Sequence, residues 1–260
     1  MSIKTNIVHL QNFGADKVYV ISEKDSYRRQ EFTKAWEWSD LEYEFVDAII
    51  GRDLDIESMI QTGRLDKFID PSGNLSKNII GVALSHQKAY EIALNEFDSI
   101  NSENRFDSNG NSLGYFLFLE DDARPTTALI NSIQDGEYTL LVEDIIKLSF
   151  DILWLGRSTP EIRGINLNGR LQHIRRFEAP GAQSYIVNVN SLRELLDSMK
   201  VINMPADLVL DKEDGILHTS LATYQTLIGQ MGTKMIHSFT GDNELPDDHI
   251  NNLYKSQTQL

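Results

Sequence analysis

The sequence predicts an α/β protein, a sheet with helices packed on it, because short apolar runs alternate with longer segments of helical period. The 260 residues are 41% hydrophobic and 24% charged, which is typical of a folded chain with a full core. No internal repeat and no sharp break in composition divides the chain. We therefore expect a single domain over residues 1–260, with an ordered core at about 17–240 and a polar C-terminal tail.

The first βαβ unit is expected near the N-terminus. Residues 18–21 form an apolar run typical of a buried strand. After a polar turn at residues 22–26, the apolar side chains of residues 27–38 recur at helical spacing. Residues 43–49 are rich in aromatic and branched side chains and run into Gly51-Arg52-Asp53, so a second strand and a turn should follow.

The middle of the chain contains the clearest helix and the clearest strand. Over residues 81–97 one stripe of a helix is formed by Val82, Ala89, Ala93 and Phe97. Residues 115–119 are continuously apolar, which predicts a central strand buried on both faces. That strand stops abruptly at Glu120-Asp121-Asp122.

The C-terminal half should extend the sheet. A helical stretch is expected to end near Phe150, and residues 152–155 and 185–189 are further strand candidates. The next helix should cover residues 191–199, because Ser191 and Glu194 have the spacing of a capping box. A last helix and a last strand are expected at residues 217–229 and 234–239.

Composition excludes several classes of protein. The chain has 24 Lys and Arg against 39 Asp and Glu, a net charge of −15, which argues against coating nucleic acid or an anionic membrane by bulk charge. It has no cysteine, so disulfides, thiolate zinc sites and a cysteine nucleophile are excluded. No apolar stretch reaches the length of a signal peptide or of a membrane span. We expect a soluble, cytoplasmic protein with no nucleic-acid partner and no membrane span.

The acidic end of the central strand is the first candidate site. In open α/β sheets the ligand crevice lies beyond the carboxyl ends of the central strands, where Glu120, Asp121 and Asp122 are expected. Adjacent carboxylates repel one another unless a cation neutralises them, and their oxygens suit Mg²⁺ or Mn²⁺. A solvated acidic turn in an acidic chain is the alternative, and the residues alone leave both open.

A basic segment at residues 157–176 is the second candidate. Its five arginines stand against the single acid Glu161, so the sign of the charge is locally inverted; they are Arg157, Arg163, Arg170, Arg175 and Arg176. Arginine forks match phosphate oxygens, which suits a nucleotide diphosphate or an anionic acceptor. The alternative is a hairpin whose arginines pair with surface carboxylates. Among the histidines, His86 should lie near the strand ends, and His237 is a further candidate metal ligand.

Seven short blocks of sequence lie between Lys17 and Gln230. They are residues 18–22, 46–51, 81–86, 118–123, 151–156, 181–187 and 204–207. The most specific pair is Gly81-Val-Ala-Leu-Ser-His86 followed by Leu119-Glu-Asp-Asp122. In this order the blocks resemble glycosyltransferase family 25, the group of bacterial lipopolysaccharide galactosyltransferases and their collagen-modifying relatives. Two features depart from the family: Ile50 stands where the family tends to have an aspartate, and the segment between Gly156 and Gly181 is particular to this chain.

The resemblance implies a GT-A-like fold with a mostly parallel central sheet and helices on both faces. It also implies a metal-dependent inverting transfer of a hexose, galactose or glucose, from a UDP-sugar to a glycan or lipid-linked glycan acceptor, with Mn²⁺ or Mg²⁺ as cofactor. Asp207 is the expected general base, with an N-cap or turn carboxylate as the alternative. The implied site residues are Glu120, Asp121, Asp122 and His237 for the metal, and Ser85, His86, Arg28, Arg157 and Arg175 for the donor.

Two other classes of function stay open at this stage. A metal-dependent phosphoryl-transfer enzyme also uses an apolar strand that ends in paired acids, but the sequence has neither a Walker motif nor a Gly-x-Gly-x-x-Gly run. A non-catalytic sugar-binding relative would keep the fold without the chemistry. The intact Glu120-Asp121-Asp122 argues against this second alternative, whereas Ile50 argues mildly for it.

Overall fold

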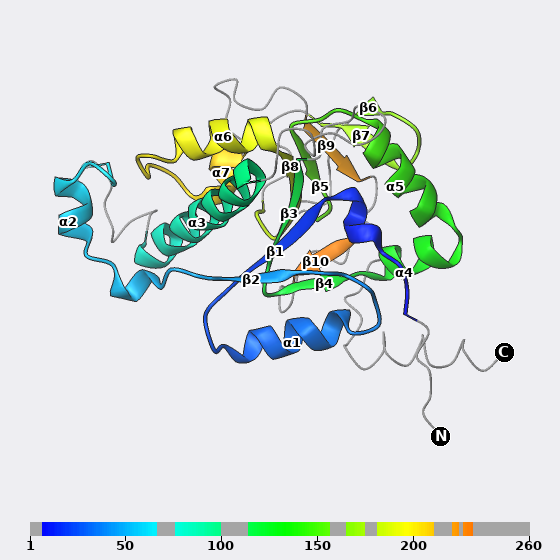
Figure 1. The fold of residues 1–260 in the computed structure, drawn as a ribbon, viewed down its shortest axis with the longest axis horizontal. Coiled ribbons are helices and arrows are strands. Elements are labelled where there is room, and N and C mark those ends of the chain that lie inside the picture. Colours follow the sequence, from blue (N-terminus) through cyan, green and yellow to red (C-terminus); the bar gives the residue numbers. More distant parts are fainter. Residues whose placement is uncertain are drawn as a thin grey trace.

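The computed structural model describes residues 7–66, 76–99, 114–156, 165–174, 181–210, 220–223 and 226–230. Within them an eight-stranded sheet has the order β2-β1-β3-β8-β5-β9-β7-β6, and helices cover it (Figure 1). The predicted α/β class is therefore confirmed. The sheet is not mostly parallel, however, because β8 runs antiparallel to both of its neighbours and β7 does so as well. It is a mixed sheet.

The predicted N-terminal βαβ unit is present. Strand β1 (Lys17–Ser22) runs parallel to β2 (Glu44–Asp47), and helix α1 (Tyr27–Trp36) connects them. The polar turn ends at Ser26, whose side chain caps α1 by accepting a hydrogen bond from the backbone N–H of Arg28. This cap places Arg28 in the first turn of α1, next to the carboxyl end of β1.

Strand β3 (Tyr115–Glu120) is the predicted central strand. It pairs with β1 in parallel and with β8 (Ser184–Asn188) antiparallel, and its residues from Phe116 to Leu119 are buried. The strand predicted at residues 152–155 is present as β5 (Ile152–Trp154), and it continues the sheet beyond β8. Strands β1, β2 and β3 are mutually aligned, so their carboxyl ends lie at one edge of the sheet.

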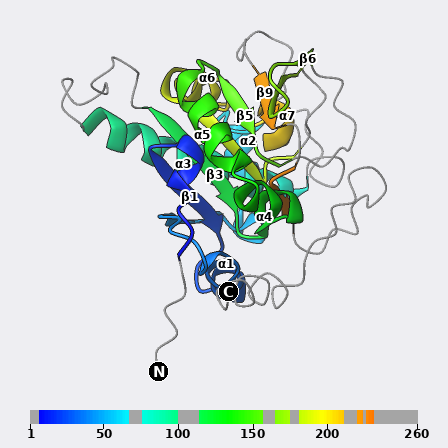
Figure 2. The same cartoon turned by 90° about the vertical axis from the view of Figure 1, so that its right-hand side faces the viewer.

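Helices cover both faces of the sheet, as expected. On one face α3 (Lys77–Ser99) and α6 (Val189–Ser198) pack on residues such as Phe118 and Tyr185. On the other face α1, α4 (Thr127–Gln134) and α5 (Glu137–Lys147) pack on residues such as Leu119 and Ile186. Figure 2, turned by 90° from Figure 1, shows α3 and α5 beside the sheet and α1 at its lower end.

Two predictions for the C-terminal half are wrong in detail. The N-cap of α6 is Asn188, whose side chain accepts from the backbone N–H groups of Asn190 and Ser191, so Ser191 lies inside the helix. The predicted helix at residues 217–229 is replaced by strands, because sheet pairing overrides local propensity there. These strands are β9 (Ser220–Thr223) and β10 (Ile228–Gln230). The predicted strand at residues 234–239 lies outside the described residues.

Four short elements were not predicted from the sequence: η1 (Gln11–Gly14), α2 (Ile56–Gln61), α7 (Ala206–Leu210) and β4 (Ala123–Pro125). The turn predicted at Gly51-Arg52-Asp53 is the short helix η2 (Gly51–Asp53). The hairpin given as the alternative for the basic segment is present as β6 (Ile165–Asn166) and β7 (Leu171–His173), which pair antiparallel. Strand β4 pairs antiparallel with β10, which fixes the chain directly after the acidic strand end. No helix among the described residues is long and apolar enough to cross a membrane.

The start of α3 lies against η2 with no room for side chains between them. A Cβ added at Gly51 would lie 2.2 Å from the carbonyl oxygen of Lys77, and one added at Gly81 would lie 2.8 Å from the backbone nitrogen of Gly51. Both glycines are required because the two backbones approach too closely for any side chain. This contact brings the polar face of α3 to the edge of the sheet where β1, β2 and β3 end.

We expect Gly51→Ala to lower the free energy of unfolding by about 1–3 kcal/mol, because the added methyl group forces η2 and α3 apart. Gly63→Ala is the matched control: its Cβ meets nothing within 4 Å, and only its positive φ of 72° opposes the change, at about 1 kcal/mol. Urea unfolding of the two variants measures the difference. Equal stability of the Gly51→Ala variant and the parent would contradict the close contact.

Candidate functional site

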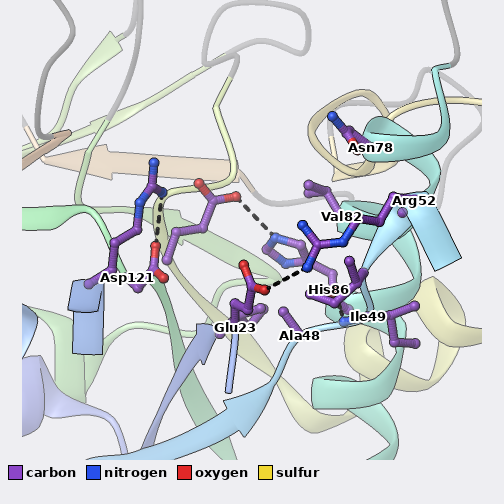
Figure 3. A pocket seen from close by; sticks show the side chains of 14 residues that line it. Glu23, Ala48, Ile49, Arg52, Asn78, Val82, His86 and Asp121 are labelled. Atoms are coloured by element: carbon purple, nitrogen blue, oxygen red, sulfur yellow. Dashed lines mark hydrogen bonds and ion pairs between the residues drawn. The ribbon is translucent and has the colours of Figure 1, made fainter. Parts of the chain in front are cut away.

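A pocket of about 380 Å³ lies at the carboxyl ends of β1, β2 and β3, where the sequence placed the ligand crevice. Strand β1 and its turn contribute Ile21 and Glu23, β3 contributes Glu120, and the turn that follows β3 contributes Asp121. Figure 3 shows Asp121 on one side of the pocket and Arg52, Asn78 and Val82 on the other. The rest of the wall is formed by Arg28, Ala48, Ile49, Ile50, Gly51, Ser85 and His86.

Glu120 and Asp121 point to opposite sides of β3 and have different partners. A carboxylate oxygen of Glu120 lies 3.3 Å from Nε2 of His86, which is fully buried on α3. Asp121 accepts a hydrogen bond of 2.8 Å from the Ser22 hydroxyl and one of 3.2 Å from Nη1 of Arg28. The structure therefore brings five of the predicted site residues to this pocket: Arg28, Ser85, His86, Glu120 and Asp121.

Arg28 is held at the pocket by Asp121, and this hydrogen bond raises the pKa of the guanidinium. Its side chain remains 45% exposed. A guanidinium has five N–H donors, so the remaining donors of Arg28 can bind an anion while one stays on Asp121. Arg28 is thus a fixed positive charge beside the acidic strand end.

Among Glu120, Asp121 and Asp122, Asp122 is the carboxylate whose negative charge is not fully compensated by its neighbours. It is buried, and its Oδ2 accepts a hydrogen bond of 2.9 Å from the side-chain amide of Gln230 on β10. Its Oδ1 is buried without a hydrogen-bond partner among the described residues. Burial, followed by the charge of Glu120, raises the pKa of Asp122 from 3.8 to about 6.

This donor set fits a divalent cation in its chemistry. Asp122 offers an unpartnered carboxylate oxygen close enough to Glu120 to feel its charge, and both donors are hard oxygens. Within the described ranges no three His, Asp or Glu side chains converge to hold a metal by themselves. The arrangement suits Mg²⁺ or Mn²⁺, which are commonly held by one or two carboxylates together with substrate phosphates and water.

The wall formed by η2 and α3 combines an arginine with apolar side chains. Arg52 extends beside Glu23, with 3.4 Å between its Nη2 and a carboxylate oxygen of that residue. Val82, expected in the buried stripe of α3, is 44% exposed and lines the pocket together with Ile50. Ser85 also lines it, but its hydroxyl donates to the Gly81 carbonyl and accepts from the backbone N–H of Ile49. Ser85 therefore joins α3 to the strand end.

Several predicted site residues do not line this pocket, and Asp122, which directly follows the lining residue Asp121, is one of them. Asp207 lies in α7, which packs against α3 and α6, and it is not among the residues that line the pocket. Its role as general base stays a prediction. Arg157, Arg175 and His237 lie outside the described residues, as does half of the basic segment, including all of its arginines except Arg170.

Arg170 belongs to the described part of the basic segment. It fits the alternative interpretation, in which the arginines of a hairpin pair with surface carboxylates. Its guanidinium donates to Asp144 at 2.8 Å and to Glu137 at 3.1 Å, and both acids belong to α5. Arg170 therefore pairs with carboxylates on the surface of a neighbouring helix. For this one arginine, the pairing favours the hairpin interpretation over phosphate binding.

Glu23, Arg52, Asn78 and Gln230 lie at the site but were not predicted from the sequence. For Arg52 a signal was present, because it follows a predicted strand at the edge where the crevice opens. Gln230 carried no such signal, since it reaches Asp122 only through the pairing of β10 with β4, more than a hundred residues away in sequence.

Comparison with known proteins identifies the family. The model of a family described as glycosyltransferase family 25 (LPS biosynthesis protein) matches residues 15–148, just over half of the chain. No curated protein sequence matches the chain. Among solved structures, the crystal structure of A197 from STIV is similar over 81% of each chain at 10% identity, with a TM-score of 0.36, too low to carry an argument.

The raised pKa of Asp122 predicts a pH-dependent effect on stability. Because the folded state holds this proton more tightly than the unfolded chain, Asp122 loses its stabilising contribution as the pH rises from about 4 through about 6. Without added metal, Asp122→Asn should raise the free energy of unfolding at about pH 7.5 by roughly 1–3 kcal/mol. The gain should vanish near pH 4. Urea unfolding in EDTA measures both, and a variant that is less stable at about pH 7.5 would contradict the prediction.

Proposed function

Because the chain belongs to glycosyltransferase family 25, we propose that it is a metal-dependent inverting enzyme that moves a hexose from a UDP-sugar to a glycan. Galactose and glucose are the proposed hexoses, and a glycan or lipid-linked glycan of lipopolysaccharide biosynthesis is the proposed acceptor. The observation that carries this proposal is the pocket of about 380 Å³ at the aligned ends of β1, β2 and β3. Its charged residues match the groups of a nucleotide diphosphate-sugar.

The phosphates are proposed to bind beside the acidic strand end. Arg28 presents free N–H donors there while Asp121 holds its guanidinium in place. Glu120 and Asp122 would hold Mn²⁺ or Mg²⁺, which when bound neutralises phosphate charge and so stabilises the leaving UDP. The oxygens of Asp122 are suited to this role, because one of them has no partner among the described residues.

The apolar side of the pocket is proposed to contact the uncharged part of the donor. Ile21, Ile50 and Val82 line it, and Arg52 and Asn78 add polar groups at its rim. In an inverting transfer the acceptor hydroxyl attacks the anomeric carbon from the face opposite the diphosphate, and a base accepts its proton. Asp207 remains the proposed base, and Arg157, Arg175 and His237 remain proposed contacts.

A second candidate function is favoured by Ile50. This side chain lines the pocket at the position where the family tends to have an aspartate, so an acid is absent from that wall. A sugar-nucleotide-binding relative without transferase activity would bind the donor and leave it intact. A panel of UDP-hexoses assayed for Mn²⁺-dependent hydrolysis separates the two functions, because only the enzyme releases UDP.

We expect the protein to bind UDP in Mn²⁺ and to bind it at least tenfold more weakly in EDTA, as calorimetry would measure. Asp122→Asn should abolish this dependence on Mn²⁺, because the amide removes the charge and one oxygen donor at nearly constant volume. Asp197→Asn on the exposed face of α6 is the matched control and should bind like the parent. An Asp122→Asn variant that binds UDP with parental affinity in Mn²⁺ would contradict the assignment of Asp122 as a metal ligand.

Arg28→Gln should weaken UDP binding by about tenfold or more, because it removes a charged hydrogen-bond donor from the phosphates. Arg193→Gln is the control, since Arg193 pairs with Asp98 on α3 and does not line the pocket. The loss for Arg28→Gln should shrink as salt is raised. Identical affinities of the two variants would show that Arg28 does not contact the donor.

A further inference from the structure

A chain of buried hydrogen bonds leads from the pocket into the core, and the proposed transfer does not use it. Beyond the contact between Glu120 and Nε2 of His86, Nδ1 of His86 lies 2.7 Å from the hydroxyl oxygen of Tyr185. The Tyr185 hydroxyl in turn lies 2.5 Å from that of Tyr90. His86, Tyr90 and Tyr185 are all at most 1% exposed.

Three elements of the fold assemble this chain. His86 and Tyr90 are four residues apart on α3, so they share one face of that helix. Tyr185 lies on β8 opposite Phe118 of β3, and Glu120 is two residues further along β3 on the same face of the sheet. The rings are also in contact, since those of His86 and Tyr185 stack with centroids 5.9 Å apart.

Counting donors and acceptors fixes the direction of the bonds. A carboxylate only accepts, so Glu120 requires a proton on Nε2 of His86. In the neutral ring Nδ1 is then an acceptor, and Tyr185 must donate to it. The Tyr185 oxygen is left to accept from Tyr90, and every buried proton of the chain has an acceptor.

The reverse direction leaves a group unsatisfied. If His86 donated from Nδ1, Tyr185 would donate to Tyr90, and the Tyr90 proton would have no acceptor, because the only hydrogen bond of its hydroxyl among the described residues is to Tyr185. A buried unpaired hydroxyl proton is costly. Burial also raises the pKa of both tyrosines, so both keep their protons at neutral pH.

We propose that Tyr185 is a positioning residue: its hydroxyl fixes His86 as the neutral ring protonated on Nε2, and His86 thereby holds the Glu120 carboxylate in the pocket. Tyr185 touches neither donor nor acceptor and acts through His86. The proposal deepens the proposed function and rests on it for the consequence for UDP binding. The arrangement of protons follows from the buried contacts alone.

Nuclear magnetic resonance of protein labelled with ¹⁵N in histidine tests which ring nitrogen of His86 carries the proton. The His86 signals are identified as those missing from a His86→Gln variant. We expect the parent to carry the proton on Nε2, with Nδ1 shifted by an accepted hydrogen bond. Tyr185→Phe should move Nδ1 to the position of an unbonded nitrogen. Tyr90→Phe should leave it in place, because Tyr90 donates only to Tyr185. A proton on Nδ1 in the parent would overturn the proposal.

The positioning role is tested by calorimetry of UDP in Mn²⁺. We expect Tyr185→Phe to weaken binding about tenfold, as is typical when a partner behind a ligand-holding group is lost. Tyr19→Phe is the matched control: Tyr19 is also fully buried, and its hydroxyl donates to Glu96 of α3, away from His86. Equal effects of the two variants would mean that the hydroxyls only stabilise the core and would overturn the role.

A double-mutant cycle then shows whether Tyr185 acts through Glu120. In a Glu120→Ala background, adding Tyr185→Phe should change UDP affinity less than twofold. A further tenfold loss would overturn the proposal that Tyr185 acts through Glu120. If Tyr185→Phe alone does not fold, the Tyr90→Phe and Tyr185→Phe double variant replaces it, because that variant leaves no orphaned hydroxyl. A parent that binds no UDP refutes the proposed function, and the resonance experiment still decides the arrangement of protons.

Discussion

The burial of β3 on both faces of the sheet is the constraint from which the site follows. Successive residues of a strand point to opposite faces, so Phe118 and then Glu120 face α3, whereas Leu119 and then Asp121 face the side of α1. Where the apolar residues end, the same alternation carries the acids to different partners. Glu120 meets His86 of α3, and Asp121 meets Arg28 of α1.

Charge compensation at this strand end is divided among elements that are distant in sequence. Arg28 of the first helix lies 3.2 Å from Asp121 and 4.0 Å from Asp122, and Gln230 of a late strand donates a hydrogen bond to Asp122. Asp122 retains a buried oxygen with no partner among the described residues, and its raised pKa reflects this deficit. A protein that maintains such a deficit gives up stability at neutral pH, which is expected where a bound ligand supplies the missing charge.

The close contact of η2 with α3 brings an arginine and apolar side chains to one wall of the pocket. Gly51 and Gly81 let the two backbones meet, so Val82 turns toward the pocket although its helical spacing suggested a core position. Ser85 bonds the backbone of Ile49 in the same region. The helical period correctly predicted α3, but burial at its first turns depends on what packs there, which the period of a single helix does not contain.

The sequence by itself determined the elements whose signal is local: the strands β1, β3, β5 and β8, the long helix α3, and the acids at the end of β3. Their apolar runs and helical spacing arise from side chains a few residues apart. Only the tertiary structure decided the antiparallel insertion of β8, the strands β9 and β10 in place of a helix, and the pairing of Asp122 with Gln230. It also decided that Tyr185 stands behind His86. Each of these depends on contacts between residues far apart in the chain, whose free energy outweighs local propensity and leaves no pattern in either segment alone.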